Sequence, residues 1–189
     1  MLDVALSFLV KNLNAYMMLR TGTSFGEAEL GRVVDEAGKC AIKPDHVGVS
    51  LVNIEEDRIF RSQMPDLTHE NGKIVTYEPP LKLNLNVLFV ANFQQYDQAL
   101  RHLSIVLSYF QAHPVFARAA YPGMDSRIER LSVELQSLSF EQLNQIWAFI
   151  GGKQILSAMY KVRVVTLQDR EPTGVGAPVS ALQLGTVAP

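Results

Sequence analysis

The chain has 189 residues and a mass of 21.0 kDa, which fits a single domain or a domain with an added arm. Hydrophobic residues make up 48% of it and charged residues 19%, a composition that excludes an intrinsically disordered chain. Seventeen basic against nineteen acidic residues give a net charge of -2, so we expect no nucleic-acid partner and no anionic membrane surface as a partner.

The N-terminal segment is apolar enough to suggest a signal peptide. However, Asp3 stands where a positively charged region is expected, and Lys11 interrupts the apolar run. The uncharged stretches also fall short of the about 20 apolar residues that a membrane helix needs. We therefore expect a chain without a signal peptide that is assembled in the cytoplasm. The single cysteine, Cys40, cannot form an intrachain disulfide, which fits a reducing compartment.

The first part of the chain is predicted to hold one helix and one strand. Apolar residues at steps of three and four predict an amphipathic helix over residues 2–19. The sequence VGVSLVNI at 47–54 predicts a strand, which the acidic run 55–57 ends. From 58 to 80 the pattern weakens and prolines interrupt it, so we expect a long loop or a partly ordered excursion. The apolar helix face comprises Leu2, Leu6, Leu9, Leu13 and Tyr16.

Residues 81–92, LKLNLNVLFVAN, give the clearest strand pattern. Leu88 and Val90 make its far end apolar on both faces, so we expect that end to be covered on both sides. A helix is predicted over residues 94–112. A second apolar strip on this helix, Ile105 and Tyr109, indicates either deep burial or a partner surface. The expected core stripe of the helix is Tyr96, Leu100, Leu103, Leu107 and Phe110.

The remaining elements are a strand, a helix and a final strand. Residues 127–138 alternate as a strand, and Ser139 with Gln142 forms a capping box that begins a helix ending at 151–152. A last strand is predicted over 159–167. The order of elements predicts an α+β fold, with a mostly antiparallel sheet of about four strands and about three helices. The residues expected to point inward from the strand at 127–138 are Leu131, Val133 and Leu135.

The last eighteen residues, 172–189, carry no charge. Such a segment has little of its own to bury, which favours disorder, yet it is too apolar for a solvated linker. The alternative is an extended arm that adds to the sheet edge or groove of a neighbouring subunit. We therefore divide the chain into an α+β domain, 1–170, and an extended or disordered C-terminal arm, 171–189.

The residue types that carry catalysis or bind metal show no recognised spacing. His102 and His113 would share a helix face about 16 Å apart, too far for one metal. His46 beside Asp45 and His69 beside Glu70 have no second ligand at a recognised spacing. Cys40 is expected to be a small semi-buried residue. Glycines match neither a phosphate loop nor a dinucleotide fingerprint. We expect no metal, no cofactor and no enzymatic activity.

Two alternatives stay open at this point. Asp97, together with His102 and His113, could line the pocket of a small hydrolase, although no nucleophile is placed. Lys161 and Arg163 share one face of the final strand, which predicts either a basic patch with Arg101 or Arg170, or a solvated sheet face.

Three segments together resemble a known family. They are VSLVNIEEDRIFRS at 49–62, PPLKLNLNVLFVANF at 79–93 with the helix that follows through LRHLSIVLSYFQAHPVF, and LSFEQLNQIWAFIGGKQILSAMYKVRVV at 138–165. Their order and spacing resemble the cap family of extracellular contractile injection systems, whose members are similar to the tail terminators of contractile phages.

This resemblance implies a structural protein rather than an enzyme. It implies a homo-oligomeric ring of about six copies that docks on the inner tube protein and the sheath protein and ends their polymerisation. The protein would then belong to an extracellular phage-tail-like particle. A baseplate or tube-associated adaptor of the same machine is the alternative. The residues that we expect at interfaces are Lys161, Arg163, Val175, Val179 and Leu182.

Overall fold

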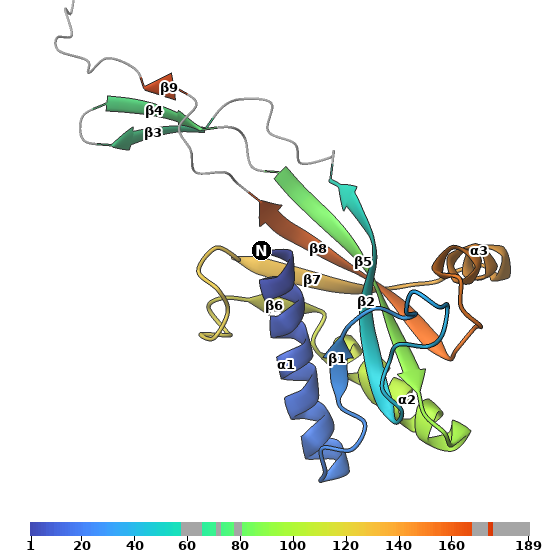
Figure 1. Ribbon diagram of the computed structural model, residues 1–189. Helices are drawn as coiled ribbons and strands as arrows, with labels where there is room; N and C mark the ends of the chain where they lie inside the picture. Colours follow the sequence, from blue (N-terminus) through green and yellow to red (C-terminus); the bar gives the residue numbers. More distant parts are fainter. Residues whose placement is uncertain (58–65, 71–72, 78–80, 168–173, 176–189) are drawn as a thin grey trace, which may run out of the picture. The chain divides into compact units, whose positions relative to one another are not determined.

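The computed structural model describes residues 1–57, 66–70, 73–77, 81–167 and 174–175 (Figure 1). Two compact units emerge from the contacts of the chain. The larger comprises Met1–Glu56 and Leu83–Val165, and the smaller comprises Asp57–Lys82 and Thr166–Pro189.

The smaller unit contains a three-stranded antiparallel sheet. β3 (Asp66–Glu70) pairs with β4 (Lys73–Tyr77), and β4 pairs in turn with β9 (Gly174–Val175). Residues 58–80 were expected to form a long loop or a partly ordered excursion. The loop alternative is wrong for β3 and β4, and the other residues lie outside the described part. The sequence between the two strands is Asn-Gly, the strongest short-range hairpin signal.

The larger unit is built on a six-stranded sheet in the order β1-β2-β5-β8-β7-β6. β1 is parallel to β2, whereas the pairs β2–β5, β7–β8 and β6–β7 are antiparallel. The mostly antiparallel α+β fold is confirmed, but about four strands was too few, because β1 and β6 are three-residue strands with no periodic signal of their own. The strands are β1 (Ala28–Leu30), β2 (His46–Glu56), β5 (Leu81–Asn92), β6 (Val115–Ala117), β7 (Arg130–Gln136) and β8 (Ser157–Leu167).

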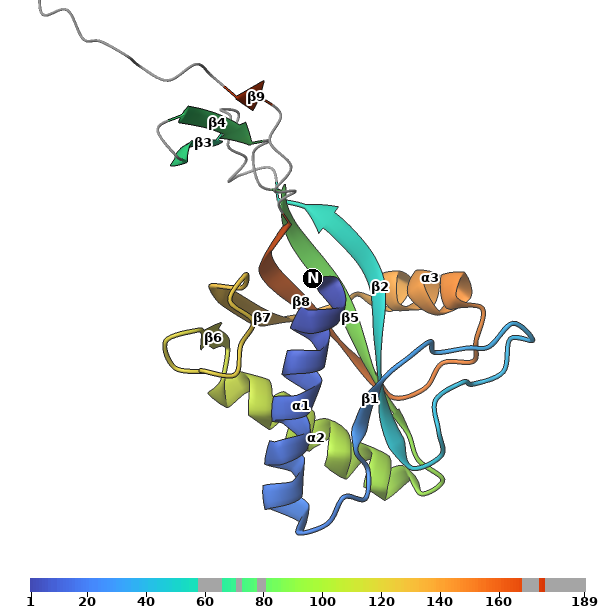
Figure 2. The same ribbon diagram turned by 60° about the vertical axis from the view of Figure 1, so that its left-hand side comes forward.

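Three helices pack on the two faces of this sheet. α1 (Leu2–Thr21) and α2 (Tyr96–Ala112) lie on one side, and α3 (Phe140–Ile150) lies on the other (Figures 1 and 2). The predicted start of α3 is confirmed, because Ser139 and Gln142 form the reciprocal capping box. Gly151, in the left-handed conformation at φ 78°, ends the helix as predicted.

The core consists of two clusters, one on each face of β5. Leu85, Val87 and Phe89 point toward α1 and α2, while Leu88 and Val90 point toward Trp147 of α3. Successive side chains on a strand alternate between its faces, so a strand covered on both sides must be apolar at consecutive positions. The prediction that the far end of residues 81–92 is covered on both sides is therefore confirmed.

The buried face of α2 differs from the predicted stripe. Tyr96 is 67% exposed and Leu100 is also exposed, whereas His102 is buried. The ring of His102 stacks on Phe93 at 4.4 Å between centroids, and its two nitrogens face the carbonyl oxygens of Gln98 (2.9 Å) and Phe25 (3.3 Å). Because the ring N–H can donate to one of these carbonyl oxygens inside the fold, the helix can bury the strip that contains His102.

Three residues of the strand predicted over 127–138 were expected to point inward. The prediction is correct for two of them and wrong for one. Leu131 and Val133 of β7 are buried, but Leu135 is exposed. β6 pairs only with Arg130–Ser132, so the far end of β7 forms a sheet edge without a described neighbour on that side. An alternating pattern identifies the face of a residue but not how far the covering elements extend.

Candidate assembly surface

A polar strip crosses four neighbouring strands on the face of the sheet where α3 packs. It consists of Glu55 on β2, Asn86 on β5, Lys161 and Arg163 on β8, and Glu134 on β7. Strand alternation places these side chains opposite Leu85, Val133 and Val162, which belong to the core cluster on the other face of the sheet. The register pairs Glu134 directly with Lys161. The predicted sharing of one face by Lys161 and Arg163 is confirmed.

Ion pairs connect the strip from strand to strand. Lys161 Nζ lies 2.8 Å from Glu55 Oε2, and Asn86 Nδ2 donates to Glu55 Oε1 at 2.6 Å. Arg163 Nη2 lies 2.9 Å from Glu134 Oε2. Each cation thus has an acidic partner within the chain, and the strip is close to neutral. Its side chains are partly exposed, so solvent screens these pairs and each contributes little to stability.

The pairing of Glu55 makes part of the stability depend on pH. Hydrogen bonds from Lys161, and then from Asn86, hold the pKa of Glu55 below its ordinary value of 4.5. A group with a lowered folded-state pKa stabilises the fold above its unfolded pKa, and this contribution is lost as the pH falls through the folded value. We expect Glu55→Gln to lower the free energy of unfolding by about 0.5–1 kcal/mol at neutral pH, and by less at pH values below the pKa.

Urea denaturation across an acid-to-neutral series measures this effect. Glu36→Gln is the matched control, because Glu36 is exposed and makes no ion pair in the described part of the chain. A Glu55→Gln deficit of constant size at every pH would contradict the assignment.

The predicted site residues are only partly brought together. Arg101 lies on α2, across the sheet from Lys161 and Arg163, so it does not join them in a basic patch. Val175 lies in β9, while Arg170, Val179 and Leu182 lie outside the described residues. The acidic partners of the strip were missed because Glu55 is 106 positions from Lys161 in sequence, and no local pattern connects them.

The hydrolase constellation does not assemble among the described residues. No hydrogen bond there joins Asp97, His102 and His113; the last faces the Tyr121 hydroxyl at 3.4 Å. Within the same ranges no three His, Cys, Asp or Glu side chains are grouped as metal ligands. Cys40 is exposed, so its expected semi-buried position is wrong.

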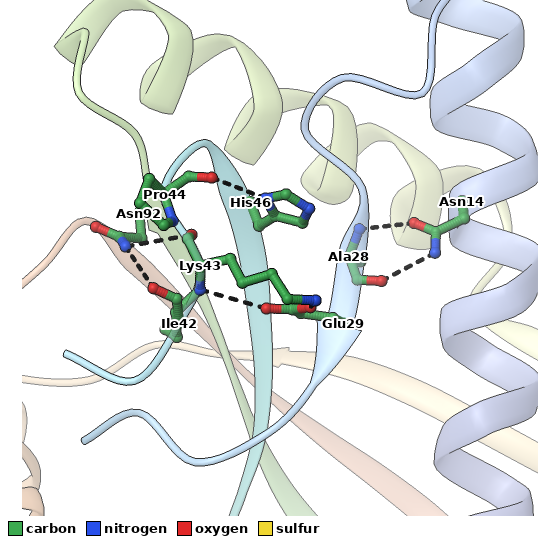
Figure 3. Close-up of polar contacts among 8 residues, drawn as sticks. All are labelled: Asn14, Ala28, Glu29, Ile42, Lys43, Pro44, His46 and Asn92. Carbon is green, nitrogen blue, oxygen red and sulfur yellow. Dashed lines mark hydrogen bonds and ion pairs between the residues drawn. The ribbon is translucent and has the colours of Figure 1, made fainter. Parts of the chain in front are cut away.

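The segment between β1 and β2 is tied to the ends of the strands (Figure 3). Asn14 of α1 accepts a hydrogen bond from the Ala28 N–H (2.7 Å) and donates to the Ala28 carbonyl (2.9 Å), which fixes β1 against the helix. Asn92, at the end of β5, donates to the carbonyls of Ile42 (2.8 Å) and Lys43 (3.3 Å). The Asn92 bonds tie the 31–45 segment to the end of β5, and Val33 and Ile42 of that segment belong to the same core cluster as Trp147 of α3.

Comparison with known families identifies the chain. The family described as the Pvc16 N-terminal domain matches residues 7–181. The chain belongs to this Pvc16 N-terminal domain family. The resemblance that the sequence predicted is therefore confirmed. No curated protein sequence matches the chain.

Solved structures share the fold of this Pvc16 N-terminal domain. The sheath/tube terminator of an extracellular contractile injection system, PVC, in its extended state, matches with a TM-score of 0.60 and 18% identity over 95% of this chain and 64% of that chain. The tube-terminating cap of the anti-feeding prophage matches with a TM-score of 0.56 and 20% identity over 92% and 59%. The chain thus spans less than two thirds of either neighbour. No helix in the described ranges meets the length and hydropathy needed to cross a bilayer.

Proposed function

We propose that the chain is a structural cap, or tail terminator, of a contractile injection system. The observation that carries this proposal is the family match over residues 7–181, supported by a fold shared with a sheath/tube terminator and a tube-terminating cap. A tube of stacked rings offers identical binding edges at each end. A subunit that stops growth must bind one such edge and fail to present the same edge onward. This role requires matching surfaces and no bond-making chemistry.

The proposed assembly is a ring of about six copies on the last disc of the inner tube and sheath, which it ends and stabilises. Its partners are copies of itself, the tube protein and the sheath protein. The chain would be assembled in the cytoplasm and then become part of an extracellular particle. Within it, the α+β domain 1–170 forms the body of the ring, and the arm 171–189, which pairs with β4 through Gly174–Val175, makes contacts with other subunits through its remaining residues.

Electron microscopy of particles made without this chain tests the role. We expect tails of uncontrolled length or unstable sheaths, restored when the chain is supplied again. Tails of normal length with intact sheaths would contradict the proposal. Normal capped ends combined with a missing baseplate would instead indicate the adaptor role in the same machine.

Lys161 and Arg163 are proposed to contact a partner in this assembly, and their pairs inside the chain determine how this should be tested. Changing either residue to Glu would place it beside an existing carboxylate and destabilise the fold. The double variant Glu55→Lys with Lys161→Glu keeps an ion pair within the strip while it reverses the charge pattern that a partner meets.

We expect this swapped variant to fold, with some loss of stability because the new carboxylate at position 161 lies directly opposite Glu134, and to cap few tails in electron micrographs. The matched control is Glu29→Lys with Lys43→Glu, which inverts a comparable pair away from the strip. If the strip variant caps tails as often as this control does, Lys161 is not part of the interface.

A further inference from the structure

A groove lies between α3 and the segment that precedes β2, within the larger unit. Its deeper part has a volume of about 420 Å³ and is lined by Val33, Val34, Trp147 and Ile155 among others. A shallower part of about 270 Å³ shares Val33 and Val34 and extends to Phe149. The two parts are therefore adjacent, and they form one apolar channel, here called the α3 groove.

The cations at the α3 groove have no acidic partner among the described residues. Arg32, Lys39 and Lys153 line it, and the described lining residues include no Asp or Glu. None of the three forms an ion pair in the part of the chain that the structure describes. A segment that carries Lys or Arg would be repelled from this groove, whereas an uncharged apolar segment would not.

The α3 groove adjoins an open edge of the sheet. β1 pairs with β2 only at Val47–Val49, although β2 continues to Glu56. Beyond Val49, no described strand pairs with β2 on this side. Ser50 and Val52, on this uncovered part, line the shallow end of the groove. Open backbone groups beside apolar pockets are the two components of a site that accepts an added strand, where main-chain bonds give affinity and pockets give specificity.

We propose that the α3 groove and the open edge of β2 receive residues 176–189 of a neighbouring copy of this chain. This inference rests on the proposed function, because a ring requires contacts between copies. The segment has fourteen residues without a charge and spans about 46 Å when fully extended, enough to follow the edge and the groove. It follows β9, where the chain already adds as a strand to β4. Its larger apolar residues are Val179, Leu182, Leu184 and Val187.

A native cysteine in the α3 groove allows the proposed contact to be tested by disulfide cross-linking. Its single cysteine, Cys40, is exposed and lines the deeper part, so a cysteine introduced into the tail has one native partner. Val179→Cys and Leu182→Cys, made separately in the full chain, should form disulfides with Cys40 of another copy under mild oxidation. Non-reducing gels would then show linked dimers and higher multimers, and peptide mass analysis would identify the Cys40 link.

Three controls make the result specific. Leu19 lies on α1, away from the groove, and its side chain is 84% exposed. The yield from Leu19→Cys therefore measures disulfides that form by random collision. Cys40→Ser combined with either tail cysteine removes the native partner. Phe149→Ser, at the groove, should lower the yield at least threefold, whereas Phe140→Ser, on the same helix but outside the groove, should not.

The possible outcomes separate this inference from the proposed function. A yield from both tail cysteines no higher than from Leu19→Cys overturns docking in the groove. A Cys40 link found only within single chains overturns the exchange between copies. Linked multimers in the soluble chain, together with normal tails in particles lacking it, would leave the groove contact intact and reject the cap role.

Discussion

Replacing Phe110 by alanine is expected to lower the free energy of unfolding by about 3–5 kcal/mol. Phe110 is 2% exposed and lies at the centre of the aromatic cluster that joins α2 to the sheet. Its ring centroid is 5.3 Å from that of Phe89 and 4.9 Å from that of Tyr160. Truncation removes buried area and leaves a cavity between α2 and the sheet, which close packing does not allow to collapse fully.

Equilibrium denaturation followed by circular dichroism measures this loss. Phe140→Ala is the matched control, because the same substitution at a side chain that is 93% exposed should change stability by no more than about 0.5 kcal/mol. Equal losses in the two variants would show that Phe110 is not a packing residue.

Elements whose boundaries depend on local chemistry could be predicted from the sequence. Residues 81–92 were predicted as a strand and form β5 with the same bounds, because strict alternation and a doubly apolar end are both local patterns. The same holds for the start of α3, where Ser139 and Gln142 lie within one turn. By contrast, β1 and β6 are strands only because β2 and β7 lie beside them.

The orientation of α2 depends on residues far away in sequence. Two apolar strips interleave on this helix, and periodicity alone does not choose between them. The choice follows from His102, which stacks on Phe93 and approaches the carbonyl of Phe25, 77 positions away. A histidine in an apolar strip is easily excluded from a predicted core, although its ring N–H can donate to a backbone carbonyl there.

In the candidate surfaces, too, the features set by local sequence could be predicted, whereas those set by strand order could not. Alternation on the last strand placed Lys161 and Arg163 on one face, which the structure confirms. The partners Glu55 and Glu134 depend on the strand order β2-β5-β8-β7, which no local pattern encodes. The α3 groove was not predicted either, because it forms between α3 and a segment more than a hundred positions earlier.

Gly26→Ala is expected to lower the free energy of unfolding by about 2–4 kcal/mol. Gly26 has φ +82°, a left-handed conformation that costs an L-residue about 1–2 kcal/mol. A Cβ atom there would also overlap the imidazole of His102, which cannot move away because it stacks on Phe93. Overpacking of this kind adds about 1–3 kcal/mol.

Two further variants separate the conformational cost from the overlap. Gly22→Ala has a similar φ of +72° with no atom within 4 Å of the added Cβ, so it should show the conformational cost alone. In a His102→Ala background, Gly26→Ala should fall to the same smaller value, because the overlapping ring is gone. Chemical denaturation of the four proteins in this double-mutant cycle gives the coupling directly. A coupling near zero would mean that the loop before β1 shifts freely, and that His102 does not hold it against α2.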